Sequence, residues 1–154
     1  MQPLPHVYAV SAAGNAIGNV ALTAKGAPRL FNAAPAEFGG PGDQWSPESM
    51  LTGAVASCFI LSFRAVARAQ RIQWLRLECA VSGTLNRIGA ALRFTNFVTR
   101  VVLTVPETAD VTACERALEK AEQGCLVANS LDAVRELQVE IVKAAMVEPA
   151  AKAG

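Results

Sequence analysis

Residues 50–63 constrain the fold of this chain most, because they carry no charged side chain and no one-sided apolar stripe. A helix that is apolar all round is buried all round. The residues before the run are typical of a helix start: Ser46 can cap free N–H groups and Pro47 suits the first helical position. Glu48 lies in the first turn, where the helix dipole favours an anion. We therefore predict a buried central helix over 46–70. A chain of 154 residues is short for covering it alone, so we expect a second subunit to help.

Composition excludes several classes of protein. A net charge of +1 gives no reason to expect a nucleic-acid partner or an anionic membrane. The apolar run is shorter than the roughly 20 residues that span a bilayer, and residues 1–5 lack the pattern of a signal peptide. With one histidine, His6, and four cysteines that form no C-x-x-C, we expect no metal and no cofactor. The sequence predicts one domain over residues 1–154, in the cytoplasm, with reduced thiols.

The remaining elements follow from alternation and from turn residues. We predict strands over 6–12, 18–25, 28–32, 73–86, 91–105 and around 137–141. Asp110 is predicted to cap a helix to about Gln123, which Gly124 ends in a left-handed conformation. Residues 148–154 are expected to be a frayed tail. This order of strands, helix, strand pair, helix and strand is that of an α+β fold.

The four cysteines differ in their settings. Cys79 alternates with apolar residues of a strand, and Cys114 shares a helical face with apolar residues, so both are predicted to be core residues. Cys125 follows a helix stop and can head a short helix, whose N-terminus lowers the pKa of a thiol. Cys58 lies in the apolar helix, where burial raises a thiol's pKa unless a cation is near. The pattern alone leaves Cys58 open between a core residue and a reactive thiol.

Several segments resemble the OsmC/Ohr family: residues 38–42, 46–48 and 56–59, then Cys125 with Asn129 and Ser130. The resemblance covers about residues 6–145. Members of that family are thiol-dependent peroxidases that reduce organic hydroperoxides, together with relatives of unknown substrate. The resemblance implies an α+β fold with antiparallel sheets around a long buried central helix. It also implies an intertwined homodimer with two active sites at the interface.

By this resemblance, Cys58 matches the peroxidatic cysteine and Cys125 the resolving cysteine, which forms a disulfide with it. Glu48 matches the acidic residue that orders an active-site arginine in the family. That arginine is expected in the turn over 14–18, where this chain has none. The cations that could replace it are Lys25, Arg29, Arg64 and Arg68. Without a dedicated cation, we expect desolvation to keep the pKa of Cys58 high.

Helix geometry bears on the way a site is assembled. Glu48 and Cys58 lie ten residues apart, or about 15 Å along one helix, and point about 80° apart. If both serve one site, as the resemblance implies, the simplest arrangement pairs Cys58 of one chain with Glu48 of the other.

Three hypotheses follow. The first is a peroxidase in which Cys58 attacks a hydroperoxide, Cys125 forms the disulfide, and an external dithiol, in the family a lipoylated protein, restores both thiols. The apolar residues expected to line its pocket and to favour organic peroxides are Phe38, Met50, Leu51, Val55 and Phe59. The second is a dimeric binding protein that keeps the pocket and thiols without efficient peroxide chemistry, because the arginine is missing. The third is an α+β dimer with structural cysteines only.

Overall fold

The computed structural model describes residues 3–144. The predicted tail over 148–154 lies outside the described residues. The chain divides into two compact units, Met1–Leu51 and Thr52–Gly154, and each is described by itself. A single domain over the whole chain therefore stays a prediction.

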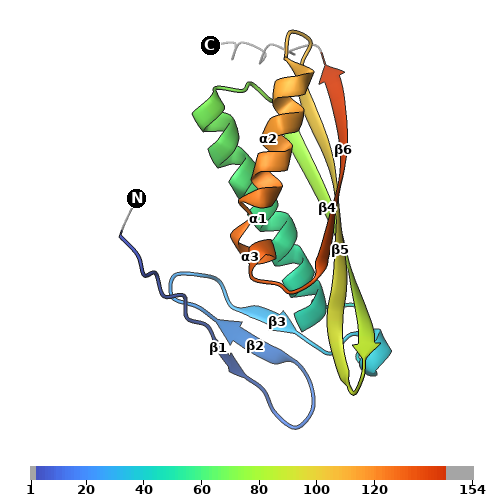
Figure 1. The fold of residues 1–154 in the computed structure, drawn as a ribbon. Helices are drawn as coiled ribbons and strands as arrows, with labels where there is room; N and C mark the ends of the chain where they lie inside the picture. Colours follow the sequence, from blue (N-terminus) through green and yellow to red (C-terminus); the bar gives the residue numbers. More distant parts are fainter. Residues whose placement is uncertain (1–2, 145–154) are drawn as a thin grey trace, which may run out of the picture. The chain divides into compact units, whose positions relative to one another are not determined.

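The first unit contains a three-stranded antiparallel sheet of order β1-β2-β3 (Figure 1). Its strands are β1 (Ser11–Ala13), β2 (Val20–Thr23) and β3 (Leu30–Asn32). All three are shorter than predicted, and residues 6–10 lie outside any strand, although their apolar pattern resembles one. Val7 and Tyr8 are both 89% exposed, so no neighbouring strand or core stabilises that segment as a strand. The loop that follows β3 carries a short 3₁₀ helix, η1 (Ala36–Phe38).

The central helix α1 (Pro47–Gln70) begins where the sequence predicts. Ser46 Oγ accepts a hydrogen bond from Ser49 N at 3.2 Å, and Ser49 Oγ accepts one from Ser46 N at 2.8 Å. This reciprocal pair satisfies two backbone donors, as in a capping box. The predicted cap at Ser46 is confirmed, and Ser49 takes the position that a Glu or Gln fills in the usual motif.

The burial of α1 is one-sided in a chain taken alone. Only one stripe of the helix, with a spacing of four residues, is buried in the single chain: Val55, Phe59, Phe63 and Ala67. Leu61, on another face, is 57% exposed. The sheet and the second helix of its own unit cover only one side, so burial of the remaining faces, which was expected to need a second subunit, stays a prediction.

The second unit is built on a three-stranded sheet of order β4-β5-β6, with β4 (Arg76–Ile88), β5 (Ala91–Pro106) and β6 (Val134–Ala144). A turn at residues 89–90 joins β4 to β5 as an antiparallel hairpin. The β1-β2-β3 sheet and the β4–β5 pair are antiparallel as expected, whereas β6 pairs with β5 in parallel, so this second sheet is mixed. The physical reason is the helical crossover between β5 and β6, which carries the chain back toward the end of the sheet from which β5 runs, so that both strands run in the same direction.

The crossover consists of α2 (Val111–Gln123) and the single turn α3 (Leu126–Asn129). Asp110 Oδ1 accepts a hydrogen bond from Ala113 N at 3.1 Å, which confirms the predicted cap. Gly124 has φ −89°, so the predicted left-handed helix end is wrong. In this backbone conformation the chain passes directly from α2 into α3, and the predicted position of Cys125 at the head of a short helix is confirmed.

The core of the second unit lies between the sheet and the two long helices, α1 and α2, which Figure 1 shows on the same face of β4, β5 and β6. As predicted, alternate residues of β5 point into this core: Phe97, Val101, Leu103 and Val105 are all buried. Their neighbours from the helices include Phe59, Phe63, Leu118 and Ala121. This packing places one end of α2, and the turn α3 beyond it, beside α1.

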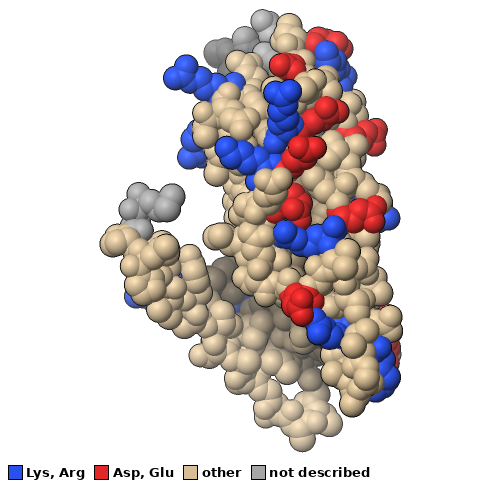
Figure 2. All heavy atoms as spheres, in the orientation of Figure 1, with Lys and Arg blue, Asp and Glu red and all other residues tan. Residues whose placement is uncertain are grey.

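By length and composition, α1 could cross a bilayer, and within residues 3–144 it is the one helix that could. The sequence analysis considered only the uncharged run over residues 50–63, which is too short to cross a bilayer. The whole helix is longer, because the turns on either side of that run belong to it as well. Phe59 and Phe63 pack in the protein core, however, as in the core helix of a soluble protein. Figure 2 shows charged side chains of both signs interspersed over the α2 side of the second unit, with no single-sign patch.

Candidate functional site

Two thiols from distant parts of the sequence meet in the second unit. Cys58 lies in the middle of α1 and is partly buried, whereas Cys125 precedes α3 and is fully buried. The Cys125 thiol donates a hydrogen bond to the Cys58 sulfur, and both thiols are free. Cys125 Sγ also lies 4.0 Å from the carbonyl oxygen of Val55, one turn before Cys58 on α1. The structure therefore brings together the two cysteines that the sequence singled out.

The start of α3 faces Cys58. The first N–H groups of a helix have no partner within the helix. Two of them, from Leu126 and Val127, donate hydrogen bonds to the Cys58 sulfur. Asn129 N donates to Cys125 O at 2.9 Å and closes this short turn. The local sequence thus converts the start of α3 into a set of donors for a thiolate on another helix.

These donors decide the pKa of Cys58. Burial raises it, but the N–H of Val127, the Cys125 thiol, the Ser62 hydroxyl and the N–H of Leu126 lower it, and the net pKa lies below the ordinary value. Hydrogen bonds to the charged form favour that form. The expectation that the pKa of Cys58 rises is therefore wrong: neutral donors stabilise the thiolate.

The candidate replacement cations can be placed. Arg64 and Arg68 lie on α1 with exposed side chains, and neither is among the causes of the lowered pKa of Cys58. Lys25 and Arg29 belong to the first unit, so a role for either at this thiol stays a prediction. Among residues 52–144, the groups that act on Cys58 are hydrogen-bond donors without charge.

The second thiol behaves in the opposite way. Burial, followed in part by its hydrogen bond to Cys58 and by the nearby carboxylate of Glu122, raises the pKa of Cys125 to about 11, although the N–H of Ala128 lowers it. The expectation that the start of α3 lowers the pKa of Cys125 is therefore wrong in its net direction. The helix start acts mainly on Cys58. The pair consists of one thiol that ionises readily and one that stays protonated and donates to it.

Comparison with known proteins agrees with this fold. A model of the OsmC-like protein family matches residues 40–141, more than half of the chain. The chain belongs to the OsmC-like family. Its fold is similar to that of an OsmC-like protein of unknown function from Vibrio cholerae, with a TM-score of 0.76 and 18% identity over 90% of this chain and 100% of that one. It is similar as well to an organic hydroperoxide resistance protein from Elizabethkingia anophelis, with a TM-score of 0.73 and 16% identity over 94% of this chain and 100% of that one.

In sequence, the chain is 27% identical over 109 residues to the uncharacterized protein YmaD of Bacillus subtilis, which covers 69% of this chain and 73% of YmaD. The OsmC/Ohr resemblance and the α+β fold class predicted from the sequence are confirmed. The similar structures establish the fold of this OsmC-like chain, and the chemistry it can perform depends on its two thiols.

A third thiol of the OsmC-like chain lies near this pair. Cys79, on β4, is partly buried and packs against the core, as predicted. Burial, and next the nearby Cys125, raise its pKa to about 11. Sequence reasoning placed Cys79 on the inner face of a strand but missed its closeness to Cys125, because pairing along a sheet says nothing about the helix above it.

The sequence analysis also missed Ser62, although a signal was present. Ser62 follows Cys58 by four residues, so the two side chains share one face of the helix, and its hydroxyl donates to the thiol. Leu126 and Val127 act through their backbone N–H groups, and the residue types at these two positions do not reveal such a role.

The other predicted site residues are divided between the two units. Glu48, Met50 and Leu51 begin α1 in the first unit, where Phe38 also lies, in η1 with 53% exposure. Val55 and Phe59 are buried in the second unit, at 3% and 1% exposure. In the single chain these two are core residues. A substrate pocket lined by this set, and the role of Glu48, therefore stay predictions.

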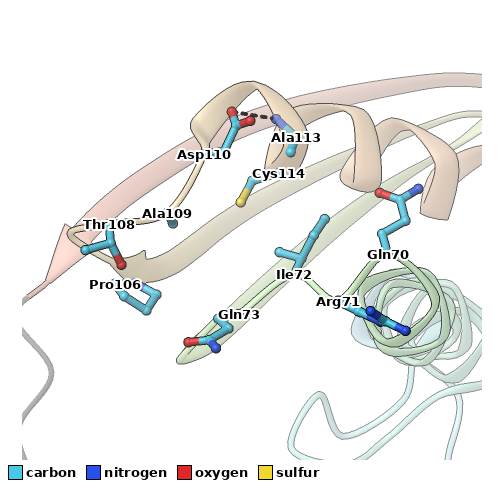
Figure 3. Close-up of a pocket in the computed structure, with 10 residues that line it drawn as sticks. All are labelled: Gln70, Arg71, Ile72, Gln73, Pro106, Thr108, Ala109, Asp110, Ala113 and Cys114. Atoms are coloured by element: carbon cyan, nitrogen blue, oxygen red, sulfur yellow. Dashed lines mark hydrogen bonds between the residues drawn. The ribbon is translucent and has the colours of Figure 1, made fainter.

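A separate hollow of about 350 Å³ lies at the other end of α2, beyond the end of α1 (Figure 3). The ends of α1 and β5, the start of α2 and the segments beside them line it: Gln70, Arg71, Ile72, Gln73, Pro106, Thr108, Ala109, Asp110, Ala113 and Cys114. Burial, and next the charges of Asp110 and Glu115, raise the pKa of Cys114. Cys114 is 1% exposed and is the core residue that the sequence predicts. Among residues 3–144, no three His, Cys, Asp or Glu side chains group as a metal site requires.

Proposed function

We propose that this OsmC-like protein is a thiol-dependent peroxidase that reduces organic hydroperoxides through Cys58 and Cys125 and serves in defence against oxidative stress. One observation carries the proposal: a thiol with a lowered pKa, Cys58, accepts a hydrogen bond from a buried thiol that stays protonated, Cys125. A peroxide is attacked by a thiolate, so the thiol that ionises more readily is the nucleophile. The similarity in fold to a protein named for organic hydroperoxide resistance supports the same class of chemistry.

The proposed reaction has three steps. The Cys58 thiolate attacks the outer oxygen of the peroxide, the O–O bond breaks, and the alkoxide leaves as an alcohol after taking a proton, so that Cys58 becomes a sulfenic acid. The Cys125 thiol then condenses with the sulfenic acid, which releases water and forms a disulfide. An external dithiol, such as the lipoyl group of a lipoylated protein, reduces the disulfide and becomes a disulfide itself.

An apolar surface beside Cys58 supports an organic substrate. Leu126 presents its N–H to the Cys58 sulfur while its side chain is 76% exposed. An alkyl group bound against that side chain would remove apolar surface from water, which hydrogen peroxide cannot do. Organic hydroperoxides are therefore the proposed substrates, and the cytoplasm, where dithiol reductants are available, is the proposed location.

A homodimer is part of the proposal. In the single chain, exposed residues of α1 include Ala54, Ser57 and Leu61, which share a face at spacings of three and four. Leaving that face in water forgoes roughly 25 cal/mol for each Å² of apolar area. A second copy of the chain is the proposed cover, and the pairing of Cys58 with Glu48 of the second chain belongs to the same proposal.

The alternative function is a dimeric binding protein that keeps the thiols without efficient peroxide chemistry. The absence of an arginine from residues 14–18 favours it, because a cation would add to the stabilisation of the thiolate. The two functions differ in rate: a peroxidase loses its Cys58 thiol in a fast reaction with a hydroperoxide, and a binding protein does not.

The test is a stopped-flow measurement of thiol loss with cumene hydroperoxide and with hydrogen peroxide. We expect fast single-turnover loss of Cys58 with the organic peroxide and slower loss with hydrogen peroxide. Cys58→Ser should abolish turnover, Cys125→Ser should consume one peroxide per site and stop at the sulfenic acid, and Cys79→Ser should stay near wild type. Wild-type thiol loss no faster than that of a small free thiol would reject the peroxidase in favour of the binding protein.

A further inference from the structure

A single arginine links the elements on either side of Cys125. Arg135, near the start of β6, donates from Nη1 to Asn129 Oδ1 at 2.7 Å, at the end of α3. Its Nε lies 3.3 Å from Glu122 Oε1, at the end of α2. Asn129 Nδ2 in turn donates to Gln123 O at 2.9 Å. The guanidinium and the Asn129 amide thus close a ring of contacts around the residues that carry Cys125.

This link is better protected than the other ion pairs in residues 3–144. The side chains of Arg135 and Glu122 are 30% and 19% exposed, whereas those of Arg76 and Glu78 are 70% and 57% exposed. Exposed ion pairs contribute little because water and salt screen them. A partly buried arginine with two partners holds them in a fixed geometry, because its donors form a rigid planar fork.

We propose that Arg135 is a positioning residue for the thiol site, because it ties the end of α2 to the end of α3 and so holds the N–H groups of Leu126 and Val127 against the Cys58 sulfur. A single helical turn has few contacts of its own, and helices this short are marginal in isolation. Fixing the last residue of α3 therefore fixes the direction of its first N–H groups. The inference deepens the proposed function, since it concerns the same thiol, but it does not require that the thiol reduce peroxides.

Glu122 gives Arg135 a second effect on the site. The Glu122 carboxylate is one of the groups that raise the pKa of Cys125. Arg135 pairs with that carboxylate and offsets part of its charge. Without the guanidinium, the Glu122 charge acts on Cys125 unopposed, and the pKa of Cys125 rises further.

The experiment measures the rate of Cys58 alkylation against pH, without peroxide, in the full-length protein and its variants. Arg135→Met removes both contacts and keeps an unbranched apolar stem. Losing one aligned donor to a charged sulfur corresponds to a rise of about one unit in the pKa of Cys58, and so to an about tenfold smaller ionised fraction below that pKa. Because the more basic thiolate is also the better nucleophile, alkylation should slow about threefold. Arg135→Lys should restore part of the shift, because one ammonium can pair with Glu122 but cannot reproduce the fork.

Arg93→Met is the matched control. Arg93 lies on the neighbouring strand β5 and pairs with Asp132, three residues beyond α3, so it also loses an arginine–carboxylate pair near the same loop. We expect the pKa of Cys58 to be unchanged in Arg93→Met. Equal shifts in both variants, or no shift in folded Arg135→Met, would overturn the inference.

A second variant covers the case in which Arg135→Met does not fold. Asn129→Ala interrupts the same set of contacts, because it removes the hydrogen bonds of the Asn129 side chain with Arg135 and with Gln123 O. It should raise the pKa of Cys58 in the same direction and speed hydrogen exchange at the N–H groups of Leu126 and Val127. An unchanged pKa in Asn129→Ala overturns the inference as well. A shifted pKa in a protein whose wild type reduces no peroxide would reject the proposed function and leave the positioning role intact.

Discussion

The two thiols of the site should react with an alkylating agent at very different rates. The perturbation is pH, and the reference is a small exposed thiol of ordinary pKa, about 8.5. Cys58 has a pKa below its ordinary value and Cys125 a pKa of about 11. We therefore expect iodoacetamide to modify Cys58 first at every pH from 6 to 9.

The magnitude follows from the ionised fraction. At pH 7.5, a thiol with a pKa of about 11 is ionised ~300-fold less than one with a pKa of about 8.5. A more basic thiolate is also a better nucleophile, by about tenfold or slightly more for this difference, since the Brønsted slope is about 0.4–0.5. Cys125 should therefore react about 20-fold more slowly than the reference thiol. Its complete burial can only slow it further.

The assay uses short pulses of isotope-coded iodoacetamide at conversions below one label per chain, followed by peptide mass spectrometry. Rates at Cys58 and Cys125 are fitted separately against pH. Labelling of Cys125 as fast as that of Cys58 at pH 7.5 would refute the reasoning, provided that the protein stays folded. Cys79, whose pKa is also about 11, is an internal control for a second slow thiol.

A variant separates the causes of the high pKa of Cys125. Burial is the largest cause, and the hydrogen bond to Cys58 and the Cys58 charge come later. In Cys58→Ser the pKa of Cys125 should fall from about 11 but stay above that of a free thiol, because burial persists. A fall to the ordinary value would show that Cys58, and not burial, sets the pKa of Cys125.

Three further outcomes are expected. One equivalent of hydroperoxide should produce a Cys58–Cys125 disulfide in peptide maps, and a bridge formed only by Cys79 or Cys114 would contradict the assignment. The pKa values of Cys79 and Cys125 are raised, so their contribution to folding stability is present below about pH 8.5 and is lost as pH rises toward about 11. Urea unfolding in the presence of reductant should therefore show a loss on the order of a few kcal/mol between pH 7.5 and 10.5, smaller in Cys79→Ser, and an unchanged midpoint would contradict this. Leu61→Glu places a charge on the exposed face of α1 and should raise the dimer dissociation constant at least about tenfold in sedimentation experiments, whereas a monomeric wild type would exclude the dimer.

Elements set by local residues were predictable from the sequence. Ser46 and Pro47 identify the start of α1, and Asp110 identifies the start of α2, because a cap acts within one helical turn. The inner face of β5 followed from alternation alone. The conformation of Gly124 could not be predicted in this way, since it depends on α3 beginning immediately afterwards and on the position of Cys125 beneath α1.

The two thiols of the candidate site were predictable from the sequence, but their donors and their electrostatics were not. The resemblance to OsmC/Ohr proteins identified Cys58 and Cys125, which the structure brings together. The direction of both pKa shifts was wrong, because the analysis considered each thiol within its own helix. The donors that stabilise the Cys58 thiolate come mainly from α3, far away in the sequence. Ser62 was the one donor readable from spacing along α1.

The source of these donors matters for an OsmC-like chain that lacks an arginine in residues 14–18. Because Leu126 and Val127 act through backbone N–H groups, substitution of their side chains by any residue except proline leaves the donors in place. Loss of the stabilisation that α3 provides then requires changes that reorient α3, and Asn129 and Arg135 carry described side-chain contacts that tie it to α2 and β6. In this chain, the sensitive positions for thiol reactivity therefore include residues that never touch the sulfur. A search for the replacement of the arginine should consider the geometry of a backbone turn as well as a second cation.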